Sequence, residues 1–278
     1  MNNSTRADIL VAVCSLCFFS GLSETEAGVI AHWTFNTCTA ADDSGNGHAG
    51  TVNGATCTSG PKGSALRFDG MDDYVEVASS ALLEGISSEL TVEAWIRPDE
   101  FISGDCCMTI VRKLLQTGDS GGFLLRLIRI DGELFVNFGV TIGFNNLVQF
   151  EDTTTPIPVG SWTHVAGTYD GSALRIYVNG AEVASLSQSL TIASTSTPLI
   201  IGRLAHNFSI EYFHGDIDEV IIHDAATTAP TPLVPAVSEW GLIVMTLLVL
   251  IAGTIICARL NWQPMLHSCV GRASHAEE

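Results

Sequence analysis

Apolar and polar residues alternate in short segments through the middle of the chain. Tyr74–Val77 and Leu90–Ile96 show the period of two that marks a strand with one buried face. Gly, Asp, Asn and Pro separate such segments, and none has the period of an amphipathic helix. We predict strands at Val29–Phe35, Tyr74–Val77, Leu90–Ile96, Gly122–Ile130, Glu133–Phe138, Trp162–Tyr169, Leu174–Asn179 and Ile217–His223. The middle of the chain is therefore predicted to be all-β.

Three dipeptides mark tight turns between these strands. Asp131-Gly132, Asp170-Gly171 and Asn179-Gly180 suit the type I′ turn of a two-residue hairpin, because both residues tolerate a positive φ. Many short strands joined in this way predict a two-sheet antiparallel jelly-roll sandwich, one domain over residues 28–224. Its core is expected to hold the aromatic residues at strand positions, which are Trp33, Phe35, Phe68, Trp95, Trp162 and Tyr177.

An apolar run near the N-terminus, Ile9–Gly21, has the length of a signal-peptide core. Arg6 precedes it, and small residues stand at Thr25 and Ala27, the two positions that a signal peptidase reads. We predict a signal peptide over residues 1–27. The alternative is an uncleaved anchor, for which the run is short.

A second apolar run, Trp240–Ala258, has 19 residues and no charge. This length is just enough to cross the hydrocarbon core of a bilayer as a helix. Arg259 follows the run and the acidic middle of the chain precedes it. The positive-inside rule then places the domain outside the membrane and the tail, 259–278, in the cytoplasm. Residues 225–239 are the predicted linker.

The net charge of the chain limits the classes of partner that it can bind. The formal net charge is −18, and nine basic and 24 acidic residues lie between Gly28 and Val237. Such a surface repels phosphate backbones, so we expect no nucleic acid partner. It attracts cations, or it serves only to keep the domain soluble.

Four of the eight cysteines fall in the predicted exported domain, where an oxidising environment favours disulfides. Cys38 and Cys57 flank a glycine-rich segment and are the predicted pair. Cys106 and Cys107 are adjacent, and a ring closed between them would be strained. A metal site is the alternative for four cysteines, but the domain has no CxxC pair with matching histidines.

Six segments of the domain occur in the order in which one known family carries them. They are AHWTFN at Ala31–Asn36, DDSGNGHAGTV at Asp42–Val52, GSALRFDGMDDYVEV at Gly63–Val77, LTVEAWIRP at Leu90–Pro98, GSWTHVAGTYDGSALRIYVNG at Gly160–Gly180 and GDIDEVIIHD at Gly215–Asp224. In this order they resemble the laminin-G-like jelly-roll domains of the concanavalin A-like superfamily, over nearly all of Val29–Asp224. The resemblance implies that the first and last strands pair, with Trp33 near Ile217–Ile222.

The DDSGNGHAG loop offers the hard oxygen ligands that Ca²⁺ prefers. Asp43 and Asn46 supply side-chain oxygens there. In laminin-G-like domains this loop meets the final IDE strand at a structural calcium, and the resemblance thereby implicates Asp218 as a third ligand. The alternative is that Asp43 caps a tight turn and no ion binds.

Catalysis is not expected. The superfamily includes glycoside hydrolases with paired acids on one strand, and the nearest string here is Asp216–Glu219. Asp216 and Asp218 share a face, but the strand continues with Val220–Ile222, so the proton donor of such a pair is missing. The sequence also contains no GxSxG, HExxH or phosphate-binding glycine loop.

The resemblance therefore implies a noncatalytic binding or adhesion module for carbohydrate or an extracellular protein ligand, by analogy of fold. Phe144–Asn146 and His206–Phe208 are candidate ligand loops, because each places an aromatic ring beside amides. Two alternatives stay open. One is a structural cell-envelope protein without a discrete ligand, and the other is a divergent carbohydrate-active enzyme.

The C-terminal segment Val234–Arg259 resembles the IPTL type of bacterial sorting signal. Pro235 and the tetrapeptide Ser238–Gly241 match that signal, and the apolar run follows at once. The tail after Arg259 departs from it. The resemblance implies a Gram-negative-type envelope and removal of the helix by a membrane sorting protease. The alternative is a permanent single-pass anchor with Trp240 at the interface.

Overall fold

The computed structural model describes residues 28–102, 106–114, 121–143, 146–206 and 209–227. They belong to a unit over Met1–Pro232, and a second unit covers Leu233–Glu278. The predicted signal peptide, sorting motif, membrane span and tail lie outside the described residues. Within the described ranges, no helix has the length and hydrophobicity that a membrane span requires.

The first large sheet has eight antiparallel strands. Seven of them follow the order β13-β12-β11-β6-β17-β4-β3, and β1 pairs with the free part of β17. The strands are β1 (Val29–Trp33), β3 (Thr56–Gly60), β4 (Gly63–Asp69), β6 (Leu90–Pro98), β11 (Thr163–Tyr169), β12 (Ala173–Val178), β13 (Ala181–Ser187) and β17 (His214–His223).

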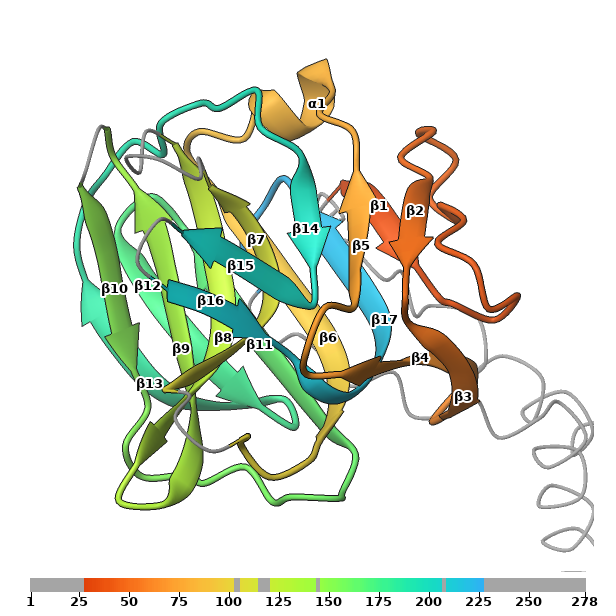
Figure 1. Ribbon diagram of the computed structural model, residues 1–278. Coiled ribbons are helices and arrows are strands. Elements are labelled where there is room, and N and C mark those ends of the chain that lie inside the picture. The colour runs from red at the N-terminus through yellow and green to blue at the C-terminus, as the bar shows by residue number, and fades with distance from the viewer. Residues whose placement is uncertain (1–27, 103–105, 115–120, 144–145, 207–208, 228–278) are drawn as a thin grey trace, which may run out of the picture. The chain divides into compact units, whose positions relative to one another are not determined.

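The second large sheet has seven antiparallel strands in the order β10-β9-β8-β7-β14-β5-β2. The strands are β2 (Gly50–Asn53), β5 (Tyr74–Val77), β7 (Cys107–Leu114), β8 (Gly122–Ile130), β9 (Glu133–Thr141), β10 (Leu147–Glu151) and β14 (Leu199–Ile201). The two sheets stack as the jelly-roll sandwich that the sequence predicted, so the predicted fold class is confirmed (Figure 1).

A small hairpin of β15 (Arg203–His206) and β16 (Ser209–Tyr212) contacts β7 and crosses in front of the second sheet in Figure 1. The described residues also contain one short helix, α1 (Ala81–Glu84), which the sequence did not predict. Its N-cap is Ser80, whose Oγ accepts the backbone N–H of Leu83 at 3.2 Å. Neither element interrupts the sandwich.

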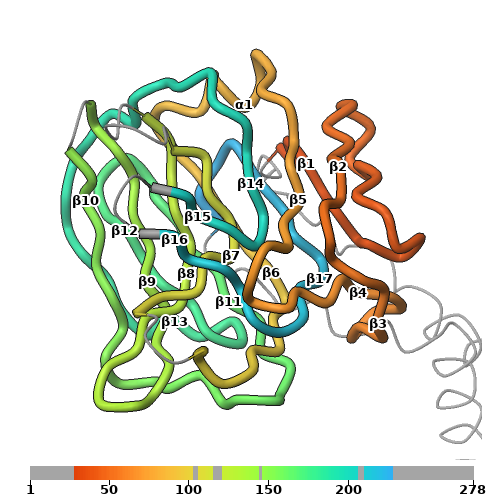
Figure 2. Tube along the Cα trace, in the orientation of Figure 1, coloured from red at the N-terminus to blue at the C-terminus, as the bar shows by residue number. Residues whose placement is uncertain are grey.

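The first and last strands pair, as expected. Trp33 of β1 lies opposite Val220 of β17, and Figure 2 shows the two strands side by side although they come from opposite ends of the domain. β8 has the predicted bounds, whereas β17 begins three residues before the predicted start, at His214.

Two of the three predicted turns have the expected geometry. Asp131–Gly132 and Asn179–Gly180 have positive φ at both residues, 51° and 91° in the first turn and 51° and 81° in the second. The prediction is wrong for the third turn, where only Gly171 has a positive φ. There the Asp170 carboxylate accepts the backbone N–H of Ser172 at 2.8 Å, which stabilises a wider turn.

The core lies between the two large sheets and contains Trp33, Phe35 and Phe68, all fully buried. Trp95 and Trp162 are not part of it and are only half-buried. The alternation along β6 gives the reason, because its neighbours Ala94 and Ile96 face the core and therefore turn Trp95 to the outer face.

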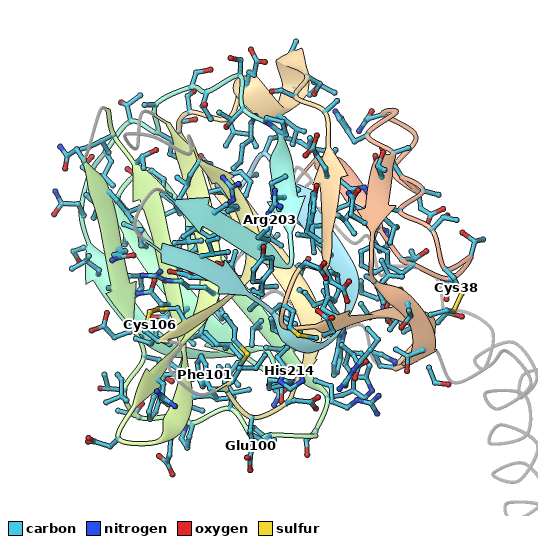
Figure 3. The ribbon with its side chains drawn as sticks, in the orientation of Figure 1. Cys38, Glu100, Phe101, Cys106, Arg203 and His214 are labelled. Carbon is cyan, nitrogen blue, oxygen red and sulfur yellow. A yellow bond between two sulfur atoms is a disulfide. The ribbon has the colours of Figure 1, made fainter. Side chains whose placement is uncertain are left out.

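The predicted disulfide is present. Cys38 is bonded to Cys57, with Cα atoms 5.2 Å apart, and ties the segment after β1 to β3. Cys106 and Cys107 also form a disulfide at the start of β7. Figure 3 shows Cys38 and Cys106 at opposite sides of the view, so the two bridges serve different parts of the sandwich.

Candidate functional site

The side-chain carboxylate of Asp42 fixes the path of the segment between β1 and β2. Its carboxylate accepts the backbone N–H groups of His32 at 3.1 Å, Ser44 at 3.0 Å and His48 at 2.7 Å. Burial opposes ionisation, but hydrogen bonding by the Ser44 side chain and by these backbone groups outweighs it and holds the pKa of Asp42 below its usual value. The turn cap is therefore Asp42 and not Asp43, for which the sequence predicted this role as the alternative to calcium binding.

Trp33 and His48 fix the same segment to the sandwich. The Trp33 Nε1–H donates to the backbone oxygen of His48 at 2.8 Å. The His48 ring lies within hydrogen-bond distance of the Ile30 carbonyl, at 3.0 Å, and of the Ser80 hydroxyl, at 2.7 Å. Because both side chains are buried, the segment that begins after Trp33 has a rigid base.

A pocket of about 260 Å³ lies on this base. We call it the loop pocket, and it is lined by Thr34, Phe35, Asn36, Thr37, Thr39, Ala41 and Asp43. Phe35 and Cys38 have positive φ values of 51° and 58°, which turn the chain sharply and keep it out of regular strand pairing. The Cys38–Cys57 disulfide holds this irregular path in place.

Five of the seven residues that line the loop pocket have polar side chains. Asp43 Oδ2 accepts the Thr34 hydroxyl at 2.6 Å, which leaves Oδ1 as an acceptor for a ligand. Asn36 Oδ1 accepts the backbone N–H of Ser64 at 3.1 Å, so its amide nitrogen is the group left to donate. Thr37 adds a hydroxyl to this set. The pocket can therefore both donate to and accept from a small polar ligand.

The calcium site predicted at Asp43, Asn46 and Asp218 stays a prediction, and the three side chains have the following contacts. Asn46 turns its Nδ2 to the carbonyls of Val29 and Ile30, at 3.0 and 2.9 Å, and Asp43 lines the loop pocket. In the part of the chain that the structure describes, no hydrogen bond links either residue to Asp218.

Asp218 itself has one property that suits a cation. It is fully buried on β17, and its Oδ2 has no partner among the described residues. Burial, assisted by the neighbouring Glu219 charge, raises the pKa of Asp218 to about 7. Asp218 Oδ2 therefore lacks a hydrogen-bond partner among the described residues, while Asp43 Oδ2 and Asn46 Nδ2 are engaged in the hydrogen bonds given above.

The acids of β17 have separate environments. Asp216 is fully buried and accepts Arg97 Nε at 2.7 Å and Arg67 Nη1 at 3.3 Å. Glu219 lies 2.9 Å from the His32 ring and 3.5 Å from the Lys62 ammonium. The neighbouring acids of β17 therefore have different surroundings, and Asp216 is held in ion pairs with two arginines.

Among the residues that line the loop pocket, the sequence predicted only Asp43 as a site residue and assigned Phe35 to the core. The segment Thr34–Thr39 carries a signal that could have found the others, since hydroxyls and an amide gather beside a predicted disulfide. Of the two predicted ligand loops, residues 144–145 and 207–208 lie outside the described residues, so those loops stay predictions.

Comparison with known families identifies the domain. The model of the concanavalin A-like lectin/glucanases superfamily matches residues 69–231. No curated protein matches the chain.

Solved structures share the fold. Domain 4 of AbnA, a GH43 extracellular arabinanase from Geobacillus stearothermophilus solved with arabinotriose, has a TM-score of 0.57 and 22% identity, covering 73% of this chain and 95% of that domain. The binding domain of Paraclostridial Mosquitocidal Protein 1 has a TM-score of 0.58 and 17% identity, over 72% of this chain and 50% of that one. The binding domain of Botulinum Neurotoxin DC in complex with SialylT has a TM-score of 0.55 and 17% identity, over 72% and 48%.

This chain spans nearly all of the arabinanase domain but only about half of each toxin domain. At these identities the likeness shows the fold and not the ligand. The family match covers more than half of the chain and falls on the sandwich described above. The chain therefore belongs to the concanavalin A-like lectin/glucanase superfamily.

Proposed function

We propose that the domain is a noncatalytic carbohydrate-binding module and that its ligand occupies the loop pocket. The observation that carries this proposal is the set of polar side chains on the lining, where Asp43 Oδ1, which has no hydrogen bond among the described residues, and the amide nitrogen of Asn36 lie among threonine hydroxyls. A sugar hydroxyl both donates and accepts, so it needs such a mixed lining. The volume of about 260 Å³ is below the ~300–1,000 Å³ of pockets for drug-sized ligands, which favours a single sugar residue.

Two further findings support a binding role. The arabinanase domain was solved with arabinotriose and the toxin domain with SialylT, and both are parts of proteins that share this fold. After Glu219, β17 continues with Val220, Ile221 and Ile222, apolar residues at the positions where a hydrolase of this fold would carry its proton donor.

The Asp43→Ala variant is expected to bind its glycan about 10–100-fold more weakly than the unmodified chain. A hydrogen bond to a charged group contributes about 1.5–3 kcal/mol, which corresponds to that range of affinity. A glycan array on the full chain first identifies the ligand, and titration calorimetry then measures both proteins. Asn36→Ala should weaken binding in the same direction.

The matched control is Glu133→Ala, which removes an exposed acid from the β8–β9 hairpin, outside the loop pocket. It should bind as the unmodified chain does. Equal affinity of all variants would move the ligand away from the loop pocket. Failure of the full chain to bind any glycan would contradict the proposed function and favour a structural envelope protein or a protein ligand.

Export and tethering form the second part of the proposal. We propose that residues 1–27 direct the chain out of the cytoplasm and that Trp240–Ala258 tethers it to the cell envelope until a sorting protease acts. The intact mass of the mature protein tests this. Loss of everything after about Trp240 supports sorting, whereas a membrane-bound form ending at Glu278 supports a permanent anchor.

Structural calcium is the third part, and it rests on Asp218 Oδ2, which has no hydrogen-bond partner among the residues that the structure describes. If Ca²⁺ binds, an excess of about 100 times its Kd stabilises the fold by about 2.7 kcal/mol, or roughly 5–10 °C in Tm for a domain of this size. The expected rise should disappear with a chelator and in Asp218→Asn. The Asp43→Ala variant tests whether the DDSGNGHAG loop contributes a calcium ligand. Equal melting temperatures with calcium and with chelator would leave the loop as a turn held by Asp42 alone.

A further inference from the structure

Two sulfur atoms and one carboxylate gather at the start of β7. Cys106 and Cys107 are consecutive, and Glu211 comes from β16, the hairpin strand that lies against β7. One ligand atom from each of the three residues lies within 4.8 Å of the other two. The cluster shares no residue with the loop pocket.

Glu211 is held in a fixed orientation beside the cysteines. It is 6% exposed, and its Oε2 accepts the Thr109 hydroxyl at 2.8 Å while its Oε1 accepts Arg126 Nη1 at 2.6 Å. Such outer contacts orient the ligands of metal sites and leave the remaining lone pairs of the carboxylate for the ion. Cys107 is buried and Cys106 is exposed, so the cluster has one side closed by protein and one side open to solvent.

The disulfide controls what this cluster can bind. While Cys106 and Cys107 are joined, neither sulfur is a thiolate, and only a thiolate is a strong metal ligand. Two electrons and two protons delivered by a dithiol, which is itself oxidised to a disulfide, convert the pair to two thiols. A divalent cation then displaces both protons as it binds the two thiolates.

We propose that the reduced Cys106–Cys107 pair and Glu211 form a metal site for a thiophilic divalent cation such as Zn²⁺ or Cd²⁺, and that oxidation to the disulfide closes this site. Thiolate ligands select such ions over Ca²⁺ and Mg²⁺. The charges balance, because the ion and Arg126 together offset two thiolates and the Glu211 carboxylate. The geometry is also accessible, since tetrahedral coordination with bonds of about 2.3 Å requires the two sulfurs to lie only about 3.8 Å apart. Solvent at the exposed Cys106 side supplies the fourth ligand.

The inference is independent of carbohydrate binding, and Cd²⁺ is the probe that tests it. The full chain is reduced with a phosphine, which takes up an oxygen atom from water while the disulfide gains two hydrogens, and the excess is removed before titration. Thiolate-to-cadmium charge-transfer absorption then counts the cadmium bound through sulfur. We expect the reduced chain to bind one more Cd²⁺ through thiolate than a Cys106→Ser/Cys107→Ser variant treated in the same way, and expect no such difference before reduction.

The double serine variant is the necessary baseline, because the chain has six other cysteines and the phosphine also opens the Cys38–Cys57 bridge. Equal absorption in the two reduced proteins would overturn the proposal. An equal difference in absorption between the two proteins before reduction would also overturn the proposal. It would show that cadmium binding does not depend on opening the Cys106–Cys107 disulfide.

Two further variants test the carboxylate. Glu211→Gln keeps the shape of the side chain and removes the charged ligand, and it should weaken Cd²⁺ binding at this site by more than about tenfold. Thr109→Val keeps all three ligands and removes only the hydroxyl that orients Glu211, with an expected loss of about tenfold. The Thr109→Val variant also provides the test of the carboxylate if Glu211→Gln does not fold. Unchanged affinity in both variants would exclude Glu211 from the site.

Discussion

Replacing Glu93 with glutamine is expected to lower the free energy of unfolding by about 3 kcal/mol at neutral pH. Glu93 lies on β6 between two histidines of neighbouring strands. Its Oε2 is 3.0 Å from His164 Nε2 on β11, and its Oε1 is 2.9 Å from His223 Nε2 on β17. An ionised carboxylate can only accept, so both rings must carry their proton on Nε2. The side chain is 7% exposed, which keeps water from replacing these bonds.

The acid dependence follows from the pKa of this carboxyl group. Burial opposes ionisation, but the hydrogen bonds from His164 and His223 outweigh it and lower the pKa of Glu93 to about 2. A carboxyl group whose pKa is lower in the folded state stabilises the fold above its unfolded pKa, and that contribution is lost as the pH falls. The loss should therefore run from about pH 4.5 down to about pH 2.

Denaturant unfolding of both proteins at a series of pH values measures the effect. The difference between them should be largest near neutral pH and should shrink toward pH 2 to 3. Glu182→Gln on β13 is the matched control, since Glu182 is exposed and should change little at any pH. Parallel stability curves for Glu93→Gln and the unmodified chain would show that the two histidine contacts do not stabilise the ionised form.

The sandwich was predictable because its strands depend on local pattern. β6, β8 and β11 alternate or run apolar, and the Asp131–Gly132 and Asn179–Gly180 turns follow from the conformational freedom of their own residues. The disulfide of Cys38 was predictable as well, since its partner flanks the same loop. Each of these features depends on residues that are close in sequence.

β7 shows why other strands were missed. It carries two consecutive charged residues, Arg112 and Lys113, which interrupt the apolar pattern of a buried strand, yet both are buried. Lys113 donates to the Ser79 hydroxyl and the Thr197 carbonyl, both at 2.8 Å. Burial lowers the pKa of Lys113 to about 8. Partners 34 and 84 residues away leave no sign in the local pattern.

The loop pocket was only partly predictable for a related reason. The sequence pointed to Asp43 because the DDSGNGHAG loop is rich in oxygen ligands. It could not show that Asp42, and not Asp43, accepts the backbone N–H groups of the turn, because adjacent aspartates are equivalent in a pattern. Nor could it show that Asn36 lies on the same pocket as Asp43, since that depends on the positive φ of Phe35 and Cys38.

Replacing Trp33 with alanine is expected to cost about 3–5 kcal/mol of the free energy of unfolding, the usual range for a buried tryptophan. Trp33 is fully buried between the sheets. It is also the point where β1 pairs with β17 and where the segment of the loop pocket begins. The substitution therefore empties part of the core and removes the Nε1–H bond to the His48 carbonyl.

Trp33→Phe separates these two contributions, because it keeps most of the ring and loses the Nε1–H donor. It leaves the His48 carbonyl buried without its partner, with an expected loss of about 1–3 kcal/mol. Denaturant unfolding gives both free energies, and hydrogen exchange at the Asp43 amide, which donates to the His32 carbonyl at 2.8 Å, reports on the loop. If the anchor holds the pocket, both variants should speed exchange at this amide well before global unfolding. Slow exchange in Trp33→Phe would instead mean that Asp42 alone fixes the loop and that Trp33 acts only through the core.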